Sequence, residues 1–281
     1  MHLIVILIVL AIAWQLRQSS IVKFELQCDR PGQYLFLFLF PPLLLLTTAV
    51  AIICMGFHGK MLGFQASWVG YTIAVSFLVV AGCSLLQLIY QGDRSIRQLK
   101  QYPQQKIGSQ TARIIEVDFP YSAQIGFWHS QLVISRGLLT TLDREHLEAV
   151  LAHELAHAYY RDTFWFFWLG WLRHLTFWLP NTELLWQELL LFRELRADCY
   201  AAQTVDFLLL AESLLTVAQA PLQSSPLFSA SFNDPQLSDR LTTRIDFLLE
   251  ETKLIPAIDW ENCSWVLLLI LPLLTILLHY Q

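Results

Sequence analysis

The stretch Leu147-Glu-Ala-Val-Leu-Ala-His153-Glu154-Leu-Ala-His157 carries the most structural information in this chain. Asp143 precedes it and is a suitable N-cap, and the apolar side chains of the stretch recur at helical spacing. We therefore expect a helix that begins after Asp143 and runs to about Arg161. Residues four apart lie on one face of a helix, so the two imidazole rings can bind one metal ion.

Glu154 follows the first histidine, where a carboxylate can polarise a metal-bound water as a general base. With 8 histidines in the chain, an H-E-x-x-H pattern arises by chance with a probability of roughly 1 in 100. The alternative is a pair of surface histidines beside a solvated glutamate. The place of the motif within an N-capped helix with a buried face favours the metal site.

Catalytic zinc sites use three protein ligands and leave one position for water. No histidine follows His157 at the H-x-x-G-x-x-H spacing, so a carboxylate from a second helix is the natural third ligand. We expect such a helix from Thr182 to about Val205. It carries Glu194 and Asp198 four residues apart, and either carboxylate can bind the metal. The alternative is a solvated face on which these acids pair with neighbouring arginines.

The composition indicates a membrane protein. Hydrophobic residues make up 55% of the chain and charged residues only 15%, whereas a soluble domain carries about 25% charge. Three uncharged runs are long enough to span a bilayer, namely Tyr34–Phe57, Met61–Gly92 and Asn262–Gln281. The run His2–Leu16 predicts a further span; a signal peptide is the alternative, but no basic residue precedes the run.

These runs predict three regions. Residues 1–92 form an N-terminal membrane region with about three transmembrane helices, residues 93–262 a polar domain that carries the metal-binding motif, and residues 263–281 a C-terminal transmembrane helix. Basic residues lie near the ends of the spans that are expected to face the cytoplasm, at Arg17, Lys23, Arg30, Arg94, Arg97, Lys100 and Lys106. We therefore expect a multi-pass protein of a bacterial plasma membrane, with residues 93–262 facing the cytoplasm.

The insert predicts further elements. Arg113-Ile-Ile-Glu-Val and Gln131–Ser135 are expected strands, and the second is a candidate edge strand that could pair with an extended substrate. The aromatic segment near 164–180 is interrupted by Arg173 and His174, and we expect it to lie at the membrane or dip into it. Residues 221–235 are expected to form a loop, and residues 237–250 a helix.

Several functional classes are excluded. The net charge is −5 and no basic stripe is present, so we expect no direct contact with nucleic acid. The five cysteines are scattered without a C-x-x-C pair, which argues against a disulfide framework or a cysteine-bound zinc. No small-molecule cofactor is expected.

The spacing His153-Glu-Leu-Ala-His157-x4-Asp162, followed by Glu194-x-x-Ala-Asp198, resembles the membrane gluzincins. One group of these contains the CaaX prenyl endopeptidases and heat-shock membrane proteases. The other contains the antirepressor-type metallopeptidases, which include the beta-lactam sensor-transducers. The order of spans and the gap of 36 residues between His157 and Glu194 favour the antirepressor type.

The resemblance implies a mainly α, multi-span membrane protein with a gluzincin-like zinc metallopeptidase domain that contains a small β-sheet. It implies one Zn²⁺ per chain on His153, His157 and Glu194, with Glu154 as the base. Asp198 and Asp162 become candidates for orienting the ligands. Two departures stand out: the sequence stops at Gln281, where sensor members continue into a ligand-binding domain, and Pro180-Asn181 replaces His-Pro.

The expected function is hydrolysis of peptide bonds in a protein substrate, with regulatory cleavage of a cytoplasmic or membrane-bound partner such as a repressor. One alternative is a quality-control or maturation protease. Another is a membrane interaction protein with a structural or vacant metal site. Oxyanion stabilisation needs a further donor, for which the candidates are His129, His146, His174, Arg240 and Arg244.

Overall fold

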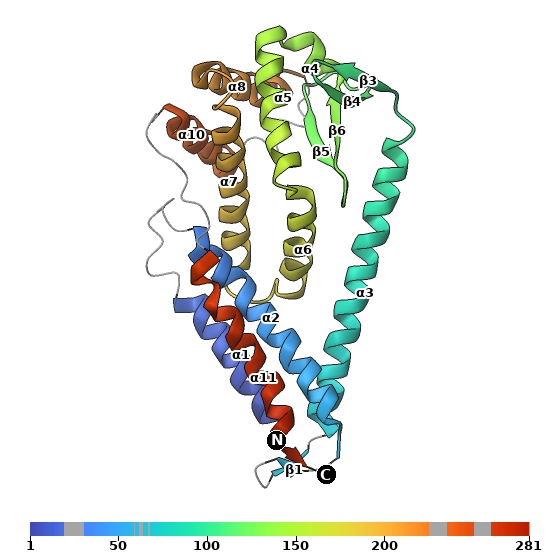
Figure 1. Cartoon of the computed structure of the whole chain (residues 1–281), viewed down its shortest axis with the longest axis vertical. Helices are drawn as coiled ribbons and strands as arrows, with labels where there is room; N and C mark the ends of the chain where they lie inside the picture. The colour runs from blue at the N-terminus through green and yellow to red at the C-terminus, as the bar shows by residue number, and fades with distance from the viewer. Residues whose placement is uncertain are drawn as a thin grey trace. The chain divides into compact units, whose positions relative to one another are not determined.

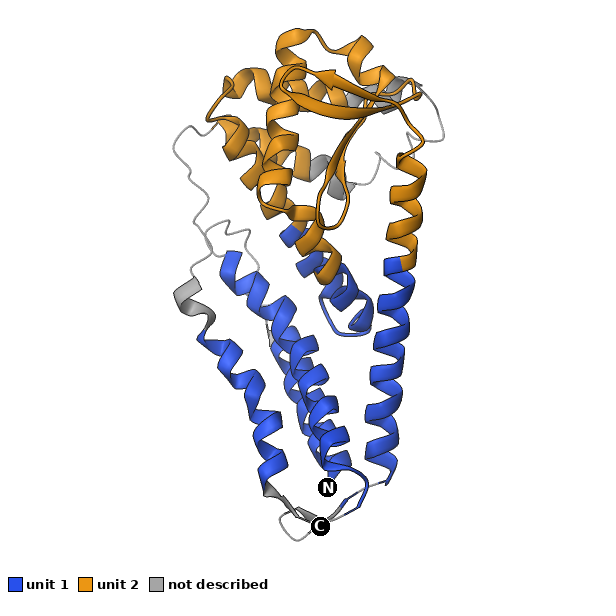
Figure 2. Ribbon diagram, turned by 45° about the vertical axis from the view of Figure 1, so that its right-hand side comes forward, with its two compact units in different colours: residues 1–89, 169–189, 256–281 blue, residues 90–168, 190–255 orange. Residues whose placement is uncertain are grey.

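The computed structural model describes residues 1–19, 31–58, 60–61, 64–66, 68–224, 235–249 and 260–280. The chain is mainly helical, with a small mixed four-stranded sheet. It divides into two compact units (Figure 2). We call Met1–Ile89, Leu169–Leu189 and Pro256–Gln281 the apolar unit, and Tyr90–Trp168 and Leu190–Ile255 the mixed unit.

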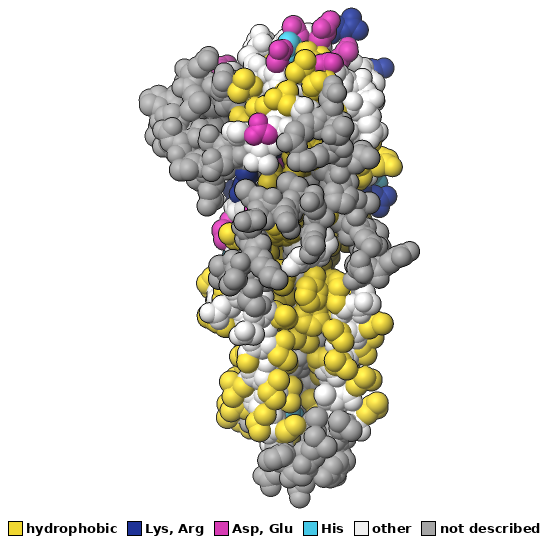
Figure 3. Space-filling model, turned by 90° about the vertical axis from the view of Figure 1, so that its left-hand side faces the viewer, with side chains coloured by type: hydrophobic (Ala, Val, Ile, Leu, Met, Phe, Trp, Pro, Cys, Tyr) yellow, Lys and Arg dark blue, Asp and Glu magenta, His cyan; other side chains and the backbone are white. Residues whose placement is uncertain are grey.

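The apolar unit contains the long hydrophobic helices predicted from the sequence. Its helices are α1 (His2–Ser19), α2 (Pro31–Met55) and most of α3 (Trp68–Leu99) (Figure 1). By length and composition, α2 and α3 can each cross a membrane, whereas α1 is shorter. On the face drawn in Figure 3, hydrophobic side chains gather over the helices of this unit.

The C-terminal segment differs from the single transmembrane helix expected at 263–281. It consists of a 3₁₀ helix η2 (Trp260–Ile270), one α-helical turn α11 (Leu271–Leu274), a second 3₁₀ helix η3 (Thr275–Leu278) and the short strand β7 (His279–Tyr280). Pro272 at the start of α11 has no amide N–H and cannot continue a regular α-helical ladder. The stretch 264–277 is an apolar helix below the length of a full span.

Strand β7 pairs with β1 (Lys60–Met61), which also pairs with β2 (Phe64–Gln65). Strands β1 and β2 lie in the connection between α2 and α3. The start of α1 also reaches this end of the unit, because a Cβ added at Gly70 would lie 2.5 Å from the Cβ of His2. The last described segment therefore pairs with the α2–α3 connection, and the first lies against the start of α3.

A helical hairpin formed by Leu169–Leu189 belongs to the apolar unit. Its turn is held by Asn181, which has a positive φ of 57° and donates a hydrogen bond of 2.7 Å to the carbonyl of Arg17. Arg17 is fully buried and donates to Thr182 Oγ1 at 3.2 Å. On the other side, Trp171 Nε1 donates to the carbonyl of Ala81 at 3.1 Å. The hairpin is thus tied to α1 and α3.

The sheet of the mixed unit contains β3 (Gln104–Ile107), β4 (Gln110–Ile115), β5 (Ser122–Ile125) and β6 (Gln131–Ser135), in the order β3-β4-β6-β5. β4 and β6 are parallel, and the other pairs are antiparallel. The expectation that 131–135 is an edge strand is wrong. Leu132, Val133 and Ile134 are all buried, as is typical of a central strand, and β5 occupies the edge.

The helices of the mixed unit include those expected at about 144–161, 182–205 and 237–250. They are α4 (Arg136–Thr141), α5 (Arg144–Tyr159), the first half of α6 (Asp162–Leu175), the second half of α7 (Thr182–Ala201), α8 (Phe207–Ser224) and α10 (Pro235–Leu249). Asp143 caps α5, since its Oδ1 accepts from the His146 amide at 3.0 Å. Arg161, with φ 54°, separates α5 from α6.

Three details differ from the predictions. Helix α6 ends at Leu175, whereas the membrane-associated segment was expected to extend to about residue 180. The segment 221–224, expected in a loop, is the last turn of α8, and the rest of that expected loop, 225–234, lies outside the described residues. Helix α8 was not predicted. Its residues pack with α5, α7 and α10 around Ala149, Ala201 and Leu210, and this core fixes the helices that carry the candidate site.

Candidate metal centre

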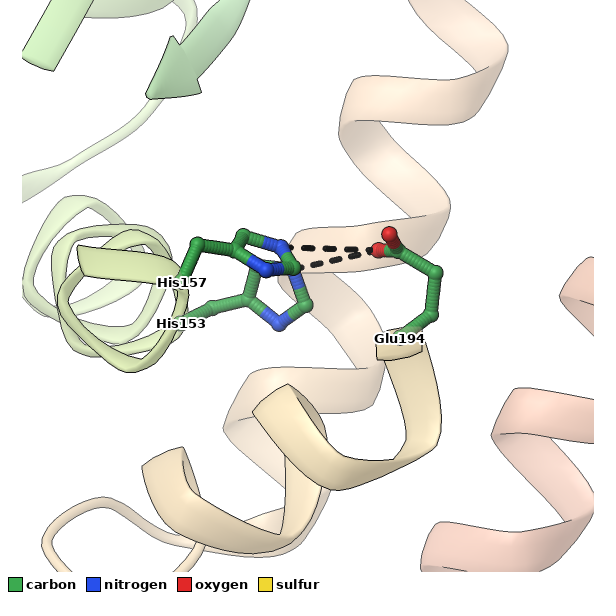
Figure 4. Close-up of side chains that lie close together, drawn as sticks. All are labelled: His153, His157 and Glu194. Atoms are coloured by element: carbon green, nitrogen blue, oxygen red, sulfur yellow. Dashed lines mark hydrogen bonds and ion pairs between the residues drawn. The ribbon is translucent and has the colours of Figure 1, made fainter. Parts of the chain in front are cut away.

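Helix α5 places His153 and His157 one turn apart on the same face. Their rings meet edge to face, with centroids 4.8 Å apart, and their Nε2 atoms are 3.1 Å apart (Figure 4). His153 is 7% exposed. Two buried imidazole nitrogens at this distance point to one common position.

Helix α7 brings Glu194 to the same position, as Figure 4 shows. Its Oε2 lies 3.4 Å from His153 Nε2 and 3.8 Å from His157 Nε2. Its Oε1 accepts hydrogen bonds from Arg193 Nε and Nη2 at 2.8 and 2.7 Å. Arg193 therefore occupies one oxygen of the carboxylate and leaves the other facing the histidines.

The spacing of these three atoms fits a metal ion. Bonds of 2.0–2.2 Å in a tetrahedral zinc site place ligand atoms about 3.3–3.6 Å apart, close to the distances of 3.1, 3.4 and 3.8 Å found here. His153, His157 and Glu194 thus form a cluster that could hold a metal ion. Two imidazoles and one carboxylate also match the donor set of an open catalytic zinc site.

An aspartate carboxylate lies beside the Nδ1 atom of each histidine. His153 Nδ1 lies 2.8 Å from Asp198 Oδ1, and His157 Nδ1 lies 2.7 Å from Asp162 Oδ2. Both aspartates are buried. A carboxylate at Nδ1 favours the tautomer with its proton on Nδ1, so the Nε2 lone pair is available to a metal.

Two arginines hold these aspartates in turn. Arg244, on α10, donates to Asp198 through Nε at 2.7 Å and Nη2 at 2.8 Å, and its Nη1 lies 3.5 Å from Glu194 Oε2. Arg196 donates to Asp162 through Nη2, and its guanidinium lies 4.1 Å from the centre of the Tyr160 ring. Two series of polar contacts therefore support the site. One joins His153, Asp198 and Arg244, and the other joins His157, Asp162 and Arg196.

The charges of the cluster are set by burial and by these partners. Burial alone would lower the pKa of His153, but Asp198 and Glu194 outweigh it and raise that pKa to about 9. Burial would raise the pKa of Glu194, but His153, Arg193 and Arg244 hold it well below the usual range. Against the same burial penalty, Arg244 and His153 lower the pKa of Asp198. Both acids are therefore anionic near neutral pH.

Glu154 is 5% exposed and lies beside the edge strand of the sheet. Ser122 Oγ, on β5, donates to Glu154 Oε1 at 2.7 Å. Within the described residues, Glu154 Oε2 has no hydrogen-bond partner. Burial, and after it the negative charge of Glu154, raise the pKa of the Tyr121 phenol. The free oxygen leaves Glu154 able to accept a hydrogen bond from water.

The candidate oxyanion donors are spread over the molecule. His146 is bound at the start of α5, with Nδ1 2.7 Å from Asp143 and Nε2 3.5 Å from Glu212. His174 belongs to the apolar unit and lines a cavity of about 270 Å³ there. His129 is exposed. Of the five candidates, Arg244 contacts the cluster, but its guanidinium is already engaged by carboxylates.

Sequence reasoning did not single out Ser122, and it considered Arg193 and Arg196 only as surface partners of the acids in the alternative to a metal site. A lone serine in a strand forms no pattern, and its contact with Glu154 spans 32 positions of sequence. Arg196 had a weak signal, because it lies two residues before Asp198 in a helix that was expected to face a metal.

Residues 94–226 match the family described as peptidase family M48. The matched segment is a little under half of the chain and contains both histidines, Glu154, Glu194 and Asp198. The match supports a zinc metallopeptidase family. No curated protein and no solved structure matches the chain.

Proposed function

We propose that this chain is a membrane-bound zinc metalloendopeptidase that hydrolyses peptide bonds of a protein substrate. The observation that carries the proposal is the convergence of His153 Nε2, His157 Nε2 and Glu194 Oε2 beside a buried glutamate with a free oxygen. The match to peptidase family M48 supports a peptidase. A purely structural site would have no use for Glu154, so this arrangement favours an enzyme over an interaction protein.

A bound zinc ion would lower the pKa of a coordinated water and polarise the scissile carbonyl. Glu154 takes the water proton on Oε2 and passes it to the leaving amine. Ser122 holds the other oxygen of Glu154 and so fixes the direction in which Oε2 points. Asp198 and Asp162 keep each imidazole in the ligand tautomer.

The proposal is tested by bound metal and activity in one preparation. The protein is purified in detergent, its metal content is measured by elemental analysis, and cleavage of an unfolded model protein is followed. We expect about one zinc per chain and cleavage in the wild type, and loss of both in Glu194→Ala. A wild type that binds no metal under zinc-replete conditions would refute the assignment.

Asp162→Asn is expected to weaken metal binding by about 10–100-fold, because an amide no longer stabilises the proton on His157 Nδ1. The measurement is competition for zinc with a chelator of known affinity. Asp93→Asn is the matched control, since Asp93 forms an exposed pair with Arg97 within α3. Equal zinc affinity in Asp162→Asn and Asp93→Asn would contradict an orienting role for Asp162.

The edge strand β5 is the better candidate for aligning an extended substrate, in place of 131–135. Ser135 N donates to the carbonyl of Tyr121, so residues 121, 123 and 125 bond to β6. The amide and carbonyl of Ser122 and Gln124 then point to the free edge. A substrate strand added there would lie beside Glu154.

Gln124→Pro removes one outward amide without touching the ladder to β6, and an edge strand tolerates proline at such a position. We expect cleavage of an unfolded protein to fall by about tenfold, the loss of roughly 1.4 kcal/mol for one hydrogen bond to substrate. Gln124→Ala should retain activity. If both variants cleave like the wild type with zinc bound, substrate does not pair with this edge.

The membrane location rests on α2 and α3, both long and apolar enough to cross a bilayer. The positions of lysine and arginine favour a multi-pass arrangement with the mixed unit in the cytoplasm. The order of spans and motif further favours an antirepressor-type role, in which a repressor or another regulatory partner is cut. Cleavage of a helix-turn-helix repressor encoded by a neighbouring gene would support that role over general quality control.

A further inference from the structure

The turn of the β5–β6 hairpin carries two aromatic residues that pack on α6. Phe127 lies 5.1 Å from Phe164 and 4.8 Å from Phe167, and Trp128 lies 5.1 Å from Phe164, measured between ring centroids. All these residues belong to the mixed unit. We call the following set the aromatic patch: Phe127, Trp128, Phe164, Trp165, Phe167 and Trp168.

Two tryptophan side chains of the aromatic patch are largely exposed. Trp128 is 68% exposed and Trp165 is 56% exposed. The turn that carries Trp128 has a fixed geometry, because Gly126 has φ 153° and a Cβ there would lie 2.4 Å from the His129 carbonyl oxygen. Exposed indole rings held by a tight turn mark a contact surface.

The charges around the patch are of one sign. No aspartate or glutamate occurs in 119–130 or in 163–175. Asp162 is buried against His157 and Arg196. Arg161 and His129, next to the patch in sequence, are exposed and form no ion pair with any residue that the structure describes. The patch therefore combines exposed tryptophan with the unpaired guanidinium of Arg161, which complements an anionic lipid surface.

We propose that the aromatic patch binds the headgroup region of an anionic phospholipid bilayer. Tryptophan prefers this region because its ring is apolar and its N–H is polar. Helix α6 continues beyond Trp168 into residues grouped with the apolar helices, which is consistent with a helix that enters the interface. A bilayer with anionic headgroups accounts for both the exposed rings and the positive charge beside them.

This surface also restricts the substrate, a consequence that rests on the proposed peptidase function. Ser122, which contacts Glu154, and Ile125, which ends β5, are three residues apart, or about 10 Å along a strand. The turn with Trp128 follows directly. A substrate strand on β5 is thus cut about 10 Å from the lipid surface. The preferred substrates are extended segments that leave the bilayer within roughly three to five residues of the cut bond.

The lipid contact can be tested on the full chain in vesicles of phosphatidylcholine and phosphatidylglycerol that contain a photoactivatable phospholipid. We expect labelling of peptides with Phe127–Trp128 and Phe164–Trp165 at a level similar to α3, and none on the exposed start of α5 at Arg144–Glu148. Trp128→Ser with Trp165→Ser should reduce labelling of the patch about tenfold. Trp68→Ser, which removes an exposed tryptophan of the apolar unit, should leave it unchanged.

Labelled α3 with an unlabelled patch would overturn the lipid contact and leave the membrane location intact. An absence of label on both would refute the membrane location together with the contact. Cross-linking of the patch to a second copy of the chain, without lipid label, would replace the bilayer by self-association. Equal labelling in vesicles of phosphatidylcholine alone would overturn the role of anionic lipid. Metal content, measured in each variant, shows that the fold is retained.

The substrate class is tested with an unfolded segment anchored by one transmembrane helix. We expect cuts to concentrate about three to five residues from the helix, and to stay there when a Gly/Ser spacer moves the original sequence outward. Cuts that follow the sequence outward would overturn this preference, even though the enzyme is active. Absence of any cleavage, in anchored and soluble proteins alike, would refute the peptidase function itself.

Discussion

Glu154→Gln is expected to keep its metal and to lose peptide hydrolysis by about 10²–10⁴-fold, the usual contribution of a positioned general base. The substitution preserves shape, and the glutamine Oε1 can still accept the hydrogen bond from Ser122 Oγ. An amide cannot take a proton from water, so the chemical step fails while the ligands are untouched. The measurement pairs elemental analysis of bound metal with cleavage of an unfolded protein.

Glu148→Gln provides the control for this result. Glu148 lies on the same helix, is exposed, and forms a surface pair of 3.1 Å with Arg144. Such a pair contributes little to stability, so the variant should cleave like the wild type. Wild-type activity in Glu154→Gln would show that Glu154 is not the general base.

Asp198→Ala is expected to damage both the fold and the metal site. The Arg244 guanidinium is mostly buried and donates two hydrogen bonds to the Asp198 carboxylate. The substitution removes this carboxylate and leaves the charge unpaired there. Breaking a buried ion pair from one side costs about 3–5 kcal/mol. It also removes the group at His153 Nδ1, for which we expect a 10–100-fold loss of metal affinity. Denaturant unfolding in detergent and chelator competition measure the two effects separately.

The double variant Asp198→Leu with Arg244→Leu distinguishes the two causes. With neither charge left in the interior, most of the lost stability should return, whereas the metal affinity should stay low because His153 still lacks its carboxylate. A double variant as unstable as Asp198→Ala would show that the instability does not come from an unpaired guanidinium.

The local parts of the candidate site could be predicted from the sequence. His153, Glu154 and His157 lie within five residues, and Asp143 determines where their helix begins, so helical geometry alone places them on one face. Glu194 was one of two open choices from the residues and was selected by the family resemblance. Glu194 Oε2 lies near both Nε2 atoms, whereas Asp198 lies at the Nδ1 atom of His153, and these distances favour Glu194 as the proposed third ligand.

The long-range parts could not be predicted in this way. Strand order depends on which strands pair with one another in the sheet. The apolar run at 131–135 fits a central strand as well as an edge strand. The position of Arg244 depends on α10 packing near α5 and α8, a contact that no local pattern encodes. For the same reason, the grouping of Leu169–Leu189 with the apolar helices emerged only from the three-dimensional contacts.

The pairing of β7 with β1 has a consequence for how often the chain crosses a bilayer. His279 lies opposite Met61 in this small sheet, so the two residues must be on the same side of any membrane that holds the apolar unit. The chain between them then crosses any such membrane an even number of times. A protease-accessible tag after Tyr280 and a label in the α2–α3 connection should therefore always be exposed together or protected together.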